Sequence, residues 1–249
     1  MLRVRRAQSG GNEDADLEPG LTELPGSFCI KRRKPMNYRY LDMDTYKRKS
    51  HFTYFRSLAY PYVGVTVNVD ITDALVRMKR ERLPFFLTVC YCVAQAANSI
   101  PEFRQRIKEE GIVEFDWCKT SHTVALEDGT YCYCALDGNM PLKEFLPYAE
   151  REQEAARQRH SIEEEEDVLG EFFISTLPWL SYTSLIQPVP VPADSNPRIT
   201  WGKYFSSEGR TLLPVTVLCH HALVDGIHLA AFYEKLQEQL GAVAAGITV

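Results

Sequence analysis

The sequence lacks every segment expected of a membrane or secreted protein. No apolar run approaches the roughly 20 residues needed to cross a bilayer. The basic residues near the N-terminus are not followed by an apolar stretch, so we expect no secretory signal. The net charge is −5, which provides no excess of positive charge to attract nucleic acid or an acidic membrane. These absences predict a cytoplasmic protein with neither a nucleic acid nor a membrane as partner.

The sequence also lacks the cysteine spacing of a zinc site. Its seven cysteines include two C-x-C pairs, at 90/92 and 132/134, but no C-x2-C pair. The count is odd and the pairs lie inside apolar runs. We therefore expect reduced, mostly buried thiols, as in intracellular proteins, and no metal.

The composition is that of an ordinary globular protein, with 45% hydrophobic and 24% charged residues among 249. Residues 1–35 differ from the rest because they are rich in Gly, acidic residues, Pro and Arg and show no periodicity. Such a segment buries too little apolar surface to offset its chain entropy. The sequence predicts a disordered, mobile extension over 1–35 and a single domain over 36–249.

Apolar periodicity within 36–249 predicts a mixture of strands and helices. Alternating valines at 63–69 predict a half-buried strand, and the apolar run at 85–100 predicts a buried helix. Further predicted elements are a helix at 72–79, strands at 111–117, 122–126 and 130–136, a polar helix at 140–160, a solvated acidic loop at 161–167, strands at 171–176, 180–185, 198–205 and 211–219, and a helix at 227–240. Because the strands and helices do not alternate regularly, we expect an α/β fold with a two-layer mixed β-sheet and packed helices, not a doubly wound parallel sheet.

The stretch "LCHHALVDGIHLAAF" contains two adjacent histidines, His220 and His221, shortly before Asp225 and Gly226. It lies between a predicted strand and a predicted helix, where a scaffold can present side chains. Neighbouring residues on an extended backbone point in opposite directions, so the two histidines cannot converge on one metal. One can act as a general base near neutral pH, or both can be structural. Asp225 can either orient a histidine or form an ion pair.

The "HHALVDG" segment fits the HHxxxDG signature and resembles the chloramphenicol O-acetyltransferase family of coenzyme A-dependent acetyltransferases. The resemblance extends to "DMDTYKRKSHFTYFR", "VTVNVDIT", "AQAANSIPEFR", "STLPWLSYTSL" and "TWGKYF", in the family's order, over about residues 37–240. It implies the family's fold and its reaction, which is acetyl transfer from acetyl-CoA to the primary hydroxyl of chloramphenicol, a form of antibiotic resistance.

The resemblance also implies roles for individual residues. His221 matches the general base, with its other ring nitrogen held by a backbone carbonyl. Asp225 matches a partner of Arg48 in a structural ion pair, and Ser175 matches the donor that stabilises the tetrahedral oxyanion. The remaining matched positions are Thr200, which supports the site through water, Lys203 and Tyr204 near the coenzyme, and Phe55, Leu185 and Gln187 in the acceptor pocket.

The resemblance further implies a homotrimer with active sites at subunit interfaces and acetyl-CoA as co-substrate. The sequence departs from the family in the acceptor pocket, where Leu185 replaces an aromatic residue and prolines occur at 188, 190 and 192. Prolines remove strand hydrogen-bond donors and reshape that wall. Two alternatives therefore remain open: an O-acetyltransferase of the same fold with another small alcohol as acceptor, and a catalytically idle trimeric binding protein.

Overall fold

The computed structural model describes residues 37–159 and 168–247. The predicted extension over 1–35 and the predicted acidic loop at 161–167 both lie outside the described residues. Within the described ranges, no helix is both long and apolar enough to cross a membrane.

A seven-stranded mixed sheet forms the centre of the fold, with the order β2-β10-β8-β7-β5-β6 and β9 paired to β10. Its strands are β2 (Tyr62–Asp70), β5 (Lys119–Ala125), β6 (Tyr131–Leu136), β7 (Glu171–Leu177), β8 (Arg198–Gly202), β9 (Phe205–Ser207) and β10 (Arg210–His220). Only β7 runs parallel to its neighbours β5 and β8. The predicted mixed α/β sheet is thus confirmed.

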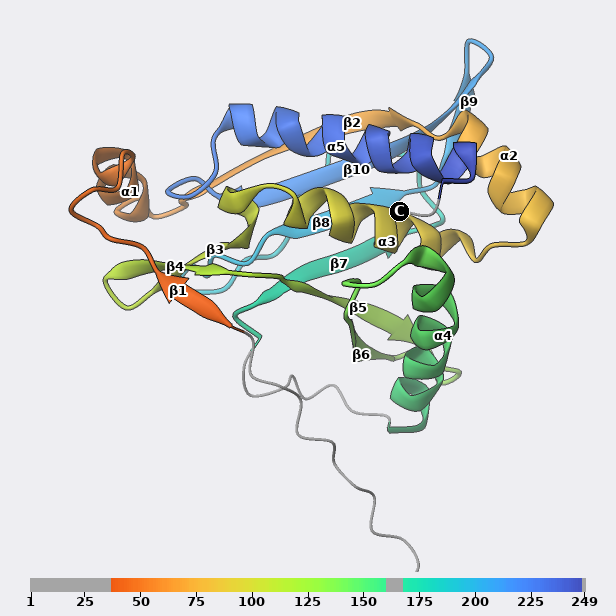
Figure 1. The fold of residues 1–249 in the computed structure, drawn as a ribbon, viewed down its shortest axis with the longest axis horizontal. Coiled ribbons are helices and arrows are strands. Elements are labelled where there is room, and N and C mark those ends of the chain that lie inside the picture. Colours follow the sequence, from red (N-terminus) through yellow and green to blue (C-terminus); the bar gives the residue numbers. More distant parts are fainter. Residues whose placement is uncertain (1–36, 160–167, 248–249) are drawn as a thin grey trace, which may run out of the picture. The chain divides into compact units, whose positions relative to one another are not determined.

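Helices cover one face of this sheet (Figure 1). They are α2 (Thr72–Glu81), α3 (Phe85–Asn98) and α5 (Gly226–Ala245), with α4 (Leu142–Arg159) over β5 and β6. Ile174, Ile199 and Val217 lie side by side in the strand register and are at most 3% exposed. They pack in the same core as residues of α2, α3 and α5. Burial of this apolar surface stabilises the two layers against each other.

The alternate residues of the same strands lie on the opposite face and are polar. Ser175 is paired with Thr200, and Thr200 with Thr216, in a line across three strands. Thr216 continues the line to Thr66, whose hydroxyl lies 2.7 Å from its own. Because side chains alternate along a strand, this row points away from the helices. The candidate site uses this polar face.

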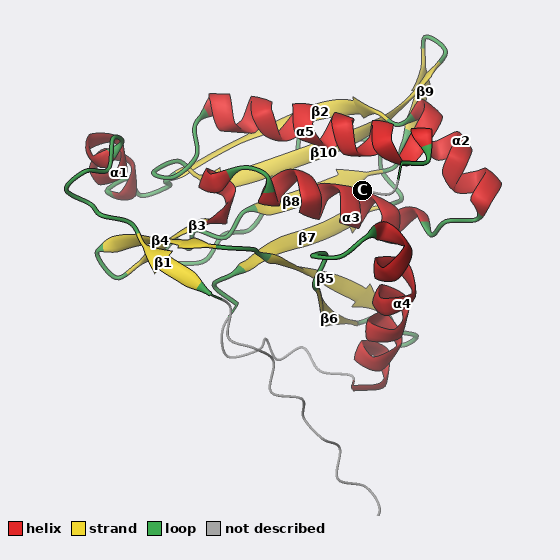
Figure 2. Cartoon of the chain, in the orientation of Figure 1, coloured by secondary structure: helices red, strands yellow, loops and turns green. Residues whose placement is uncertain are grey.

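Smaller elements lie beside the main sheet. Strands β1 (Tyr38–Tyr40), β3 (Gln105–Lys108) and β4 (Gly111–Phe115) form a second, antiparallel sheet, and a 3-10 turn at Pro101–Arg104 precedes β3. Helix α1 (Lys49–Arg56) lies apart from the other helices, as Figure 2 shows. Of this sheet, only β4 was predicted from the sequence.

The predicted strand at 180–185 was wrong. Residues 178–197 contain neither a strand nor a helix. The Leu180 carbonyl accepts a hydrogen bond from the backbone N–H of Lys203 (2.7 Å), and the Lys203 carbonyl accepts one from the Ser181 hydroxyl (2.7 Å). The segment is therefore tied to the end of β8 by single contacts, and the prolines that follow prevent a continuous ladder.

The prediction of free, mostly buried thiols is confirmed for the described residues. Cys90, Cys92, Cys118, Cys132, Cys134 and Cys219 are all free and buried. Burial raises the pKa of the Cys90, Cys92 and Cys219 thiols to about 12. They are therefore protonated and unreactive near neutral pH.

Gly202 allows the irregular segment to approach β8. A Cβ atom at this position would lie 2.5 Å from the Leu180 carbonyl oxygen and 2.8 Å from the Tyr182 ring. We expect Gly202→Ala to lower the free energy of unfolding by about 1–3 kcal/mol, because the added atom forces the segment outward. Urea denaturation measures this change. Gly111→Ala is the matched control, because nothing lies within 4 Å of its added Cβ, and an equal loss in both variants would contradict the prediction.

Candidate active site

His221 follows β10 in a tight turn that leads to α5. Its backbone N–H donates to the Pro61 carbonyl (2.7 Å), which extends the contact between β10 and β2 by one residue. The turn is closed by the N–H groups of Leu223 and Val224, which both donate to the His220 carbonyl (3.0 and 3.1 Å). The imidazole of His221 is therefore carried on a short backbone segment that is fixed at both ends.

The ring of His221 has a defined proton arrangement. Its Nδ1 lies 3.0 Å from the Val224 carbonyl oxygen. A carbonyl can only accept a hydrogen bond, so in the neutral ring Nδ1 carries the proton and Nε2 holds the free lone pair. The Asp225 carboxylate oxygen Oδ1 lies 3.2 Å from the same Nδ1. This arrangement presents Nε2 as an unprotonated nitrogen able to accept a proton.

Arg48 braces the turn from the other side. Its Nη2 forms a 2.7 Å ion pair with Asp225 Oδ2, and its Nη1 donates to the Leu223 carbonyl. The Arg48 and Asp225 side chains are only 18% and 31% exposed. The structure thus brings together the two residues expected to pair, and Asp225 contacts His221 as well as Arg48.

Helix α1 supplies a second contact to the imidazole. Arg48 is the N-cap residue of this helix, and Phe55 lies two turns further along it. Because residues seven apart share a face of a helix, both side chains point to the same turn. The Phe55 and His221 rings are stacked, with centroids 3.8 Å apart and planes 18° apart. The phenyl ring fixes the plane of the imidazole.

The other two histidines near the turn have structural contacts. His220 is buried, and its Nδ1 accepts a hydrogen bond from the Ala222 N–H (3.2 Å). His228 Nδ1 accepts one from the Asp225 N–H (2.9 Å), and its Nε2 faces the Glu102 carboxylate at 3.6 Å. Burial lowers the pKa of both rings, that of His220 to about 4. Both are therefore neutral acceptors that hold the backbone around His221.

A pocket of about 420 Å³ opens on the polar face of the sheet. It contains four of the predicted site residues, namely Ser175, Thr200, Leu185 and Gln187. Ser175 is exposed and stands beside Thr200 in the strand register. The hydroxyl of Thr200 donates to Gln187 Oε1 (3.2 Å), which ties the irregular segment to β8.

Tyr182 reinforces this pocket. Its hydroxyl donates to the Thr200 carbonyl (3.0 Å) and accepts from the Thr216 hydroxyl (3.3 Å). A purely apolar ring in place of Tyr182 would lack the hydroxyl, and the two threonines would lose this hydrogen-bond partner. Sequence reasoning did not assign Tyr182 a role, because its contacts depend on how the irregular segment folds back.

The structure does not bring His221 and Ser175 together within one chain. Ser175 belongs to the row of Thr200 and Thr216, whereas β10 continues for four residues from Thr216 to His220. A strand rises about 3.3 Å per residue, so the row and the end of β10 are about 13 Å apart along the sheet. Each chain therefore carries two separate groups, a histidine turn and a hydroxyl-lined pocket.

The residues expected near the coenzyme lie outside both groups. Lys203 and Tyr204 follow β8 at the end remote from Arg198, and both are exposed. The Tyr204 ring packs near Phe85 of α3, with centroids 5.5 Å apart. No cluster of His, Cys, Asp or Glu suited to a metal occurs within 37–159 and 168–247.

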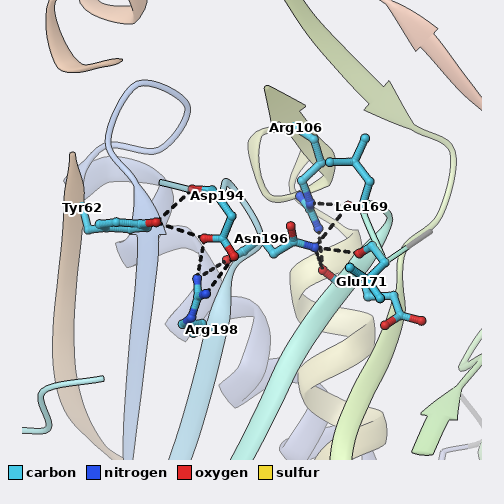
Figure 3. Close-up of polar contacts among 8 residues, drawn as sticks. Tyr62, Arg106, Leu169, Glu171, Asp194, Asn196 and Arg198 are labelled. Atoms are coloured by element: carbon cyan, nitrogen blue, oxygen red, sulfur yellow. Dashed lines mark hydrogen bonds and ion pairs between the residues drawn. The ribbon is translucent and has the colours of Figure 1, made fainter. Parts of the chain in front are cut away.

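Besides Tyr182, sequence reasoning missed three residues beside the pocket. Arg198 lines it, and the Asp194 carboxylate binds the Arg198 guanidinium through two contacts of 2.7 Å. The Tyr62 hydroxyl lies 3.0 Å from the same carboxylate (Figure 3). Asp194 belongs to the irregular segment and Tyr62 to β2, so no local pattern predicted their contact.

Figure 3 also shows how the neighbouring chain segments are fastened. The Asn196 amide donates to the Val168 and Glu171 carbonyls (2.8 and 2.9 Å). The fully buried Arg106 donates to the Leu169 and Glu171 carbonyls (2.8 and 3.0 Å). These contacts hold the start of β7 and the start of β8 in register.

Removal of the Asp225 charge tests the contribution of its ion pair with Arg48. We expect Asp225→Asn to lower the free energy of unfolding by about 1–3 kcal/mol, because Arg48 then keeps a partly buried charge without its counterion. Thermal unfolding measures this loss. Asp44→Asn is the matched control, because its ion pair with Lys49 is largely exposed and contributes little. Equal stability of Asp225→Asn and the parent protein would contradict a stabilising role for this ion pair.

The two most buried histidines predict a loss of stability in acid. Burial lowers the pKa of His122, like that of His220, from 6.5 to about 4. A depressed pKa means that the unfolded chain takes up a proton first, so stability present above pH 6.5 is lost as the pH falls towards 4. We expect His122→Gln to reduce the slope of unfolding free energy against pH by up to about 1.4 kcal/mol per pH unit in this window. Urea titrations measure it, and an unchanged slope in His122→Gln would contradict the prediction.

The chain is similar to a family of known proteins. The family model for chloramphenicol acetyltransferase matches residues 36–237. A chloramphenicol acetyltransferase of a Klebsiella species is 28% identical over 210 residues, covering 83% of this chain and 95% of that protein. Chloramphenicol acetyltransferase 3 of Escherichia coli is 29% identical over 209 residues, covering 82% of this chain and 97% of that protein.

The fold comparison gives the same result. A solved chloramphenicol acetyltransferase superposes with a TM-score of 0.72 at 26% identity, and the match covers 82% of this chain and all of the other. The dihydrolipoamide acetyltransferase of Azotobacter vinelandii shares the fold with a TM-score of 0.58 at 19% identity. The chain belongs to the chloramphenicol acetyltransferase family of acyltransferase enzymes.

Proposed function

We propose that this protein transfers the acetyl group of acetyl-CoA to the primary hydroxyl of chloramphenicol. The observation that carries the proposal is the state of the His221 ring. With Nδ1 occupied by the Val224 carbonyl, the free Nε2 can accept the proton of an alcohol. The stacked Phe55 and the Arg48–Asp225 pair hold that nitrogen in place before the substrate arrives.

The proposed reaction is a direct transfer with a single base. Nε2 of His221 takes the hydroxyl proton while the alcohol oxygen attacks the thioester carbonyl, and a tetrahedral intermediate forms. The Ser175 hydroxyl donates a hydrogen bond to its oxyanion. The intermediate then collapses with cleavage of the carbon–sulfur bond, and the protonated imidazole returns its proton to the coenzyme A thiolate. The products are the acetyl ester and free coenzyme A, and the base is regenerated.

The separation of His221 from Ser175 supports assembly of the site from more than one chain. One acceptor hydroxyl must meet both groups, and the strand register keeps them apart within a single chain. We propose that the histidine turn of one subunit faces the pocket of a neighbour in a homotrimer. Two such subunits supply a complete site, which a closed ring repeats at each interface.

A second candidate function is acetylation of a different small alcohol. The observation that favours it is the pocket wall, where Gln187 and Arg198 add polar groups to a segment already shaped by prolines. The catalytic chemistry is the same in both cases, and only the acceptor differs.

Thiol release tests the proposed function directly. Purified protein with acetyl-CoA and chloramphenicol should release coenzyme A thiol, measured with a chromogenic disulfide. We expect His221→Ala to lower kcat/KM by about 10²–10⁴-fold, because a general base is lost. We expect Ser175→Ala to lower kcat by about 10²–10³-fold through loss of an oxyanion donor. Removal of residues 1–35 should leave turnover intact.

His51→Ala provides the control, because His51 is exposed on α1. Turnover of other alcohols without turnover of chloramphenicol would favour the second candidate. Absence of coenzyme A binding would contradict both and favour an idle binding protein.

A further inference from the structure

Arg198 introduces a charged side chain into the wall of the pocket. The register pairs Arg198 with Phe173 of β7, and the guanidinium carbon lies 5.4 Å from the centre of the Phe173 ring. Both residues line the pocket. Since alternate residues of a strand share a face, Arg198 stands on the same face as Thr200, about 7 Å further along β8.

The guanidinium is held in one orientation. Its two Nη atoms each lie 2.7 Å from a different oxygen of Asp194, and its Nη1 also lies 3.3 Å from the Asn196 carbonyl. The Tyr62 hydroxyl binds the same carboxylate (Figure 3). Because these contacts already hold the guanidinium in place, it loses little further conformational freedom when another group binds to it.

Two of its five N–H donors remain available. Asp194 and Asn196 accept both Nη1–H donors and one Nη2–H donor, whereas the Nε–H and the second Nη2–H meet no acceptor among the described residues. The Nε atom is not among the buried side-chain atoms that lack a hydrogen-bond partner, so it is accessible to solvent. The Arg198 side chain is only 12% exposed. Because it lines the pocket, a ligand in the pocket can reach these two donors.

The charge of the pair restricts the group that these donors can bind. Asp194 neutralises the guanidinium, so the wall offers hydrogen-bond donors without net positive charge. An anionic group placed there would also approach the Asp194 carboxylate. A neutral oxygen, such as an amide carbonyl, accepts the hydrogen bond without that repulsion.

We propose that Arg198 is a specificity-determining residue that selects neutral alcohols with a second, hydrogen-bond-accepting oxygen about 7 Å from the reacting hydroxyl. The reacting hydroxyl lies at Ser175 and Thr200, and the second oxygen lies at Arg198. The apolar remainder of the acceptor packs against Leu177, Leu185 and Phe173. This assignment rests on the proposed function because it requires the pocket to receive the acceptor.

Two alcohols of equal length test the assignment by binding alone. N-(3-hydroxypropyl)benzamide carries the amide oxygen, and 5-phenylpentan-1-ol replaces the amide by methylene groups. Their dissociation constants are measured by calorimetry on the full-length protein and on Arg198→Lys. Lysine keeps a positive charge to pair with Asp194 but lacks the fork of donors. We expect the substitution to weaken binding of the amide alcohol about tenfold and that of the apolar alcohol less than about twofold.

Arg77→Lys is the matched control. Arg77 is 20% exposed, pairs with Glu81 at 3.0 Å and donates to the Val243 carbonyl (2.7 Å), but it lies on α2 away from the pocket. It should leave the ratio of the two dissociation constants unchanged. If Arg198→Lys fails to fold, the double variant Arg198→Met with Asp194→Asn provides the same readout without an unpaired buried charge.

Equal weakening of both alcohols, or of neither, would overturn the role of Arg198. Tighter binding of 6-hydroxyhexanoate than of the amide alcohol would overturn the preference for a neutral oxygen. Failure of the proposed function has a different signature, which is binding of the alcohols without release of thiol from acetyl-CoA. The binding ratio and the thiol assay therefore separate the two outcomes.

Discussion

The ion pair between Arg48 and Asp225 is the contact on which the histidine turn depends. Arg48 begins α1, and Asp225 begins α5, almost the whole length of the domain later. Their contact fixes both helices relative to the turn, and the Leu223 carbonyl adds a second anchor to the same guanidinium. Once the backbone is held in this way, the Val224 carbonyl can set the proton arrangement of His221 and Phe55 can set its plane. The ion pair thus holds the geometry of the turn.

The central sheet separates packing from chemistry. One face carries Ile174, Ile199 and Val217 against the helices, and the other carries Ser175, Thr200 and Thr216. Because side chains alternate along each strand, a single set of strands performs both tasks. The polar face is continuous across the strands, so the pocket can be altered without disturbing the core. Gln187 and Arg198 line the pocket on that face, and Tyr182 on the segment above it contacts Thr200 and Thr216.

Side-chain contacts, and not secondary structure, hold the pocket wall in position. Residues 178–197 contain neither a strand nor a helix, and polar contacts fasten them at several points. Tyr182 fastens the segment near its beginning, and Asp194 fastens it near its end, through Arg198 and Tyr62. A wall of this kind changes shape with single substitutions, since each anchor is one side chain. The shape of the pocket therefore depends on a few side chains, whereas backbone hydrogen bonds close the histidine turn.

From the sequence alone, periodicity predicted the mixed α/β fold and most of its strands and helices. The resemblance carried by the HHxxxDG motif implied the pairing of Arg48 with Asp225, which the structure contains. Its local signals failed at 180–185, where an apolar, β-prone run forms no strand because the chain is tied to Lys203 by single contacts. Only the tertiary structure decided that Ser175 and His221 lie in separate groups, and that Tyr62, Asp194 and Arg198 meet beside the pocket. Ser175 and His221, like Tyr62 and Asp194, are far apart in the chain, and where they lie follows from strand order and register, which no local pattern encodes.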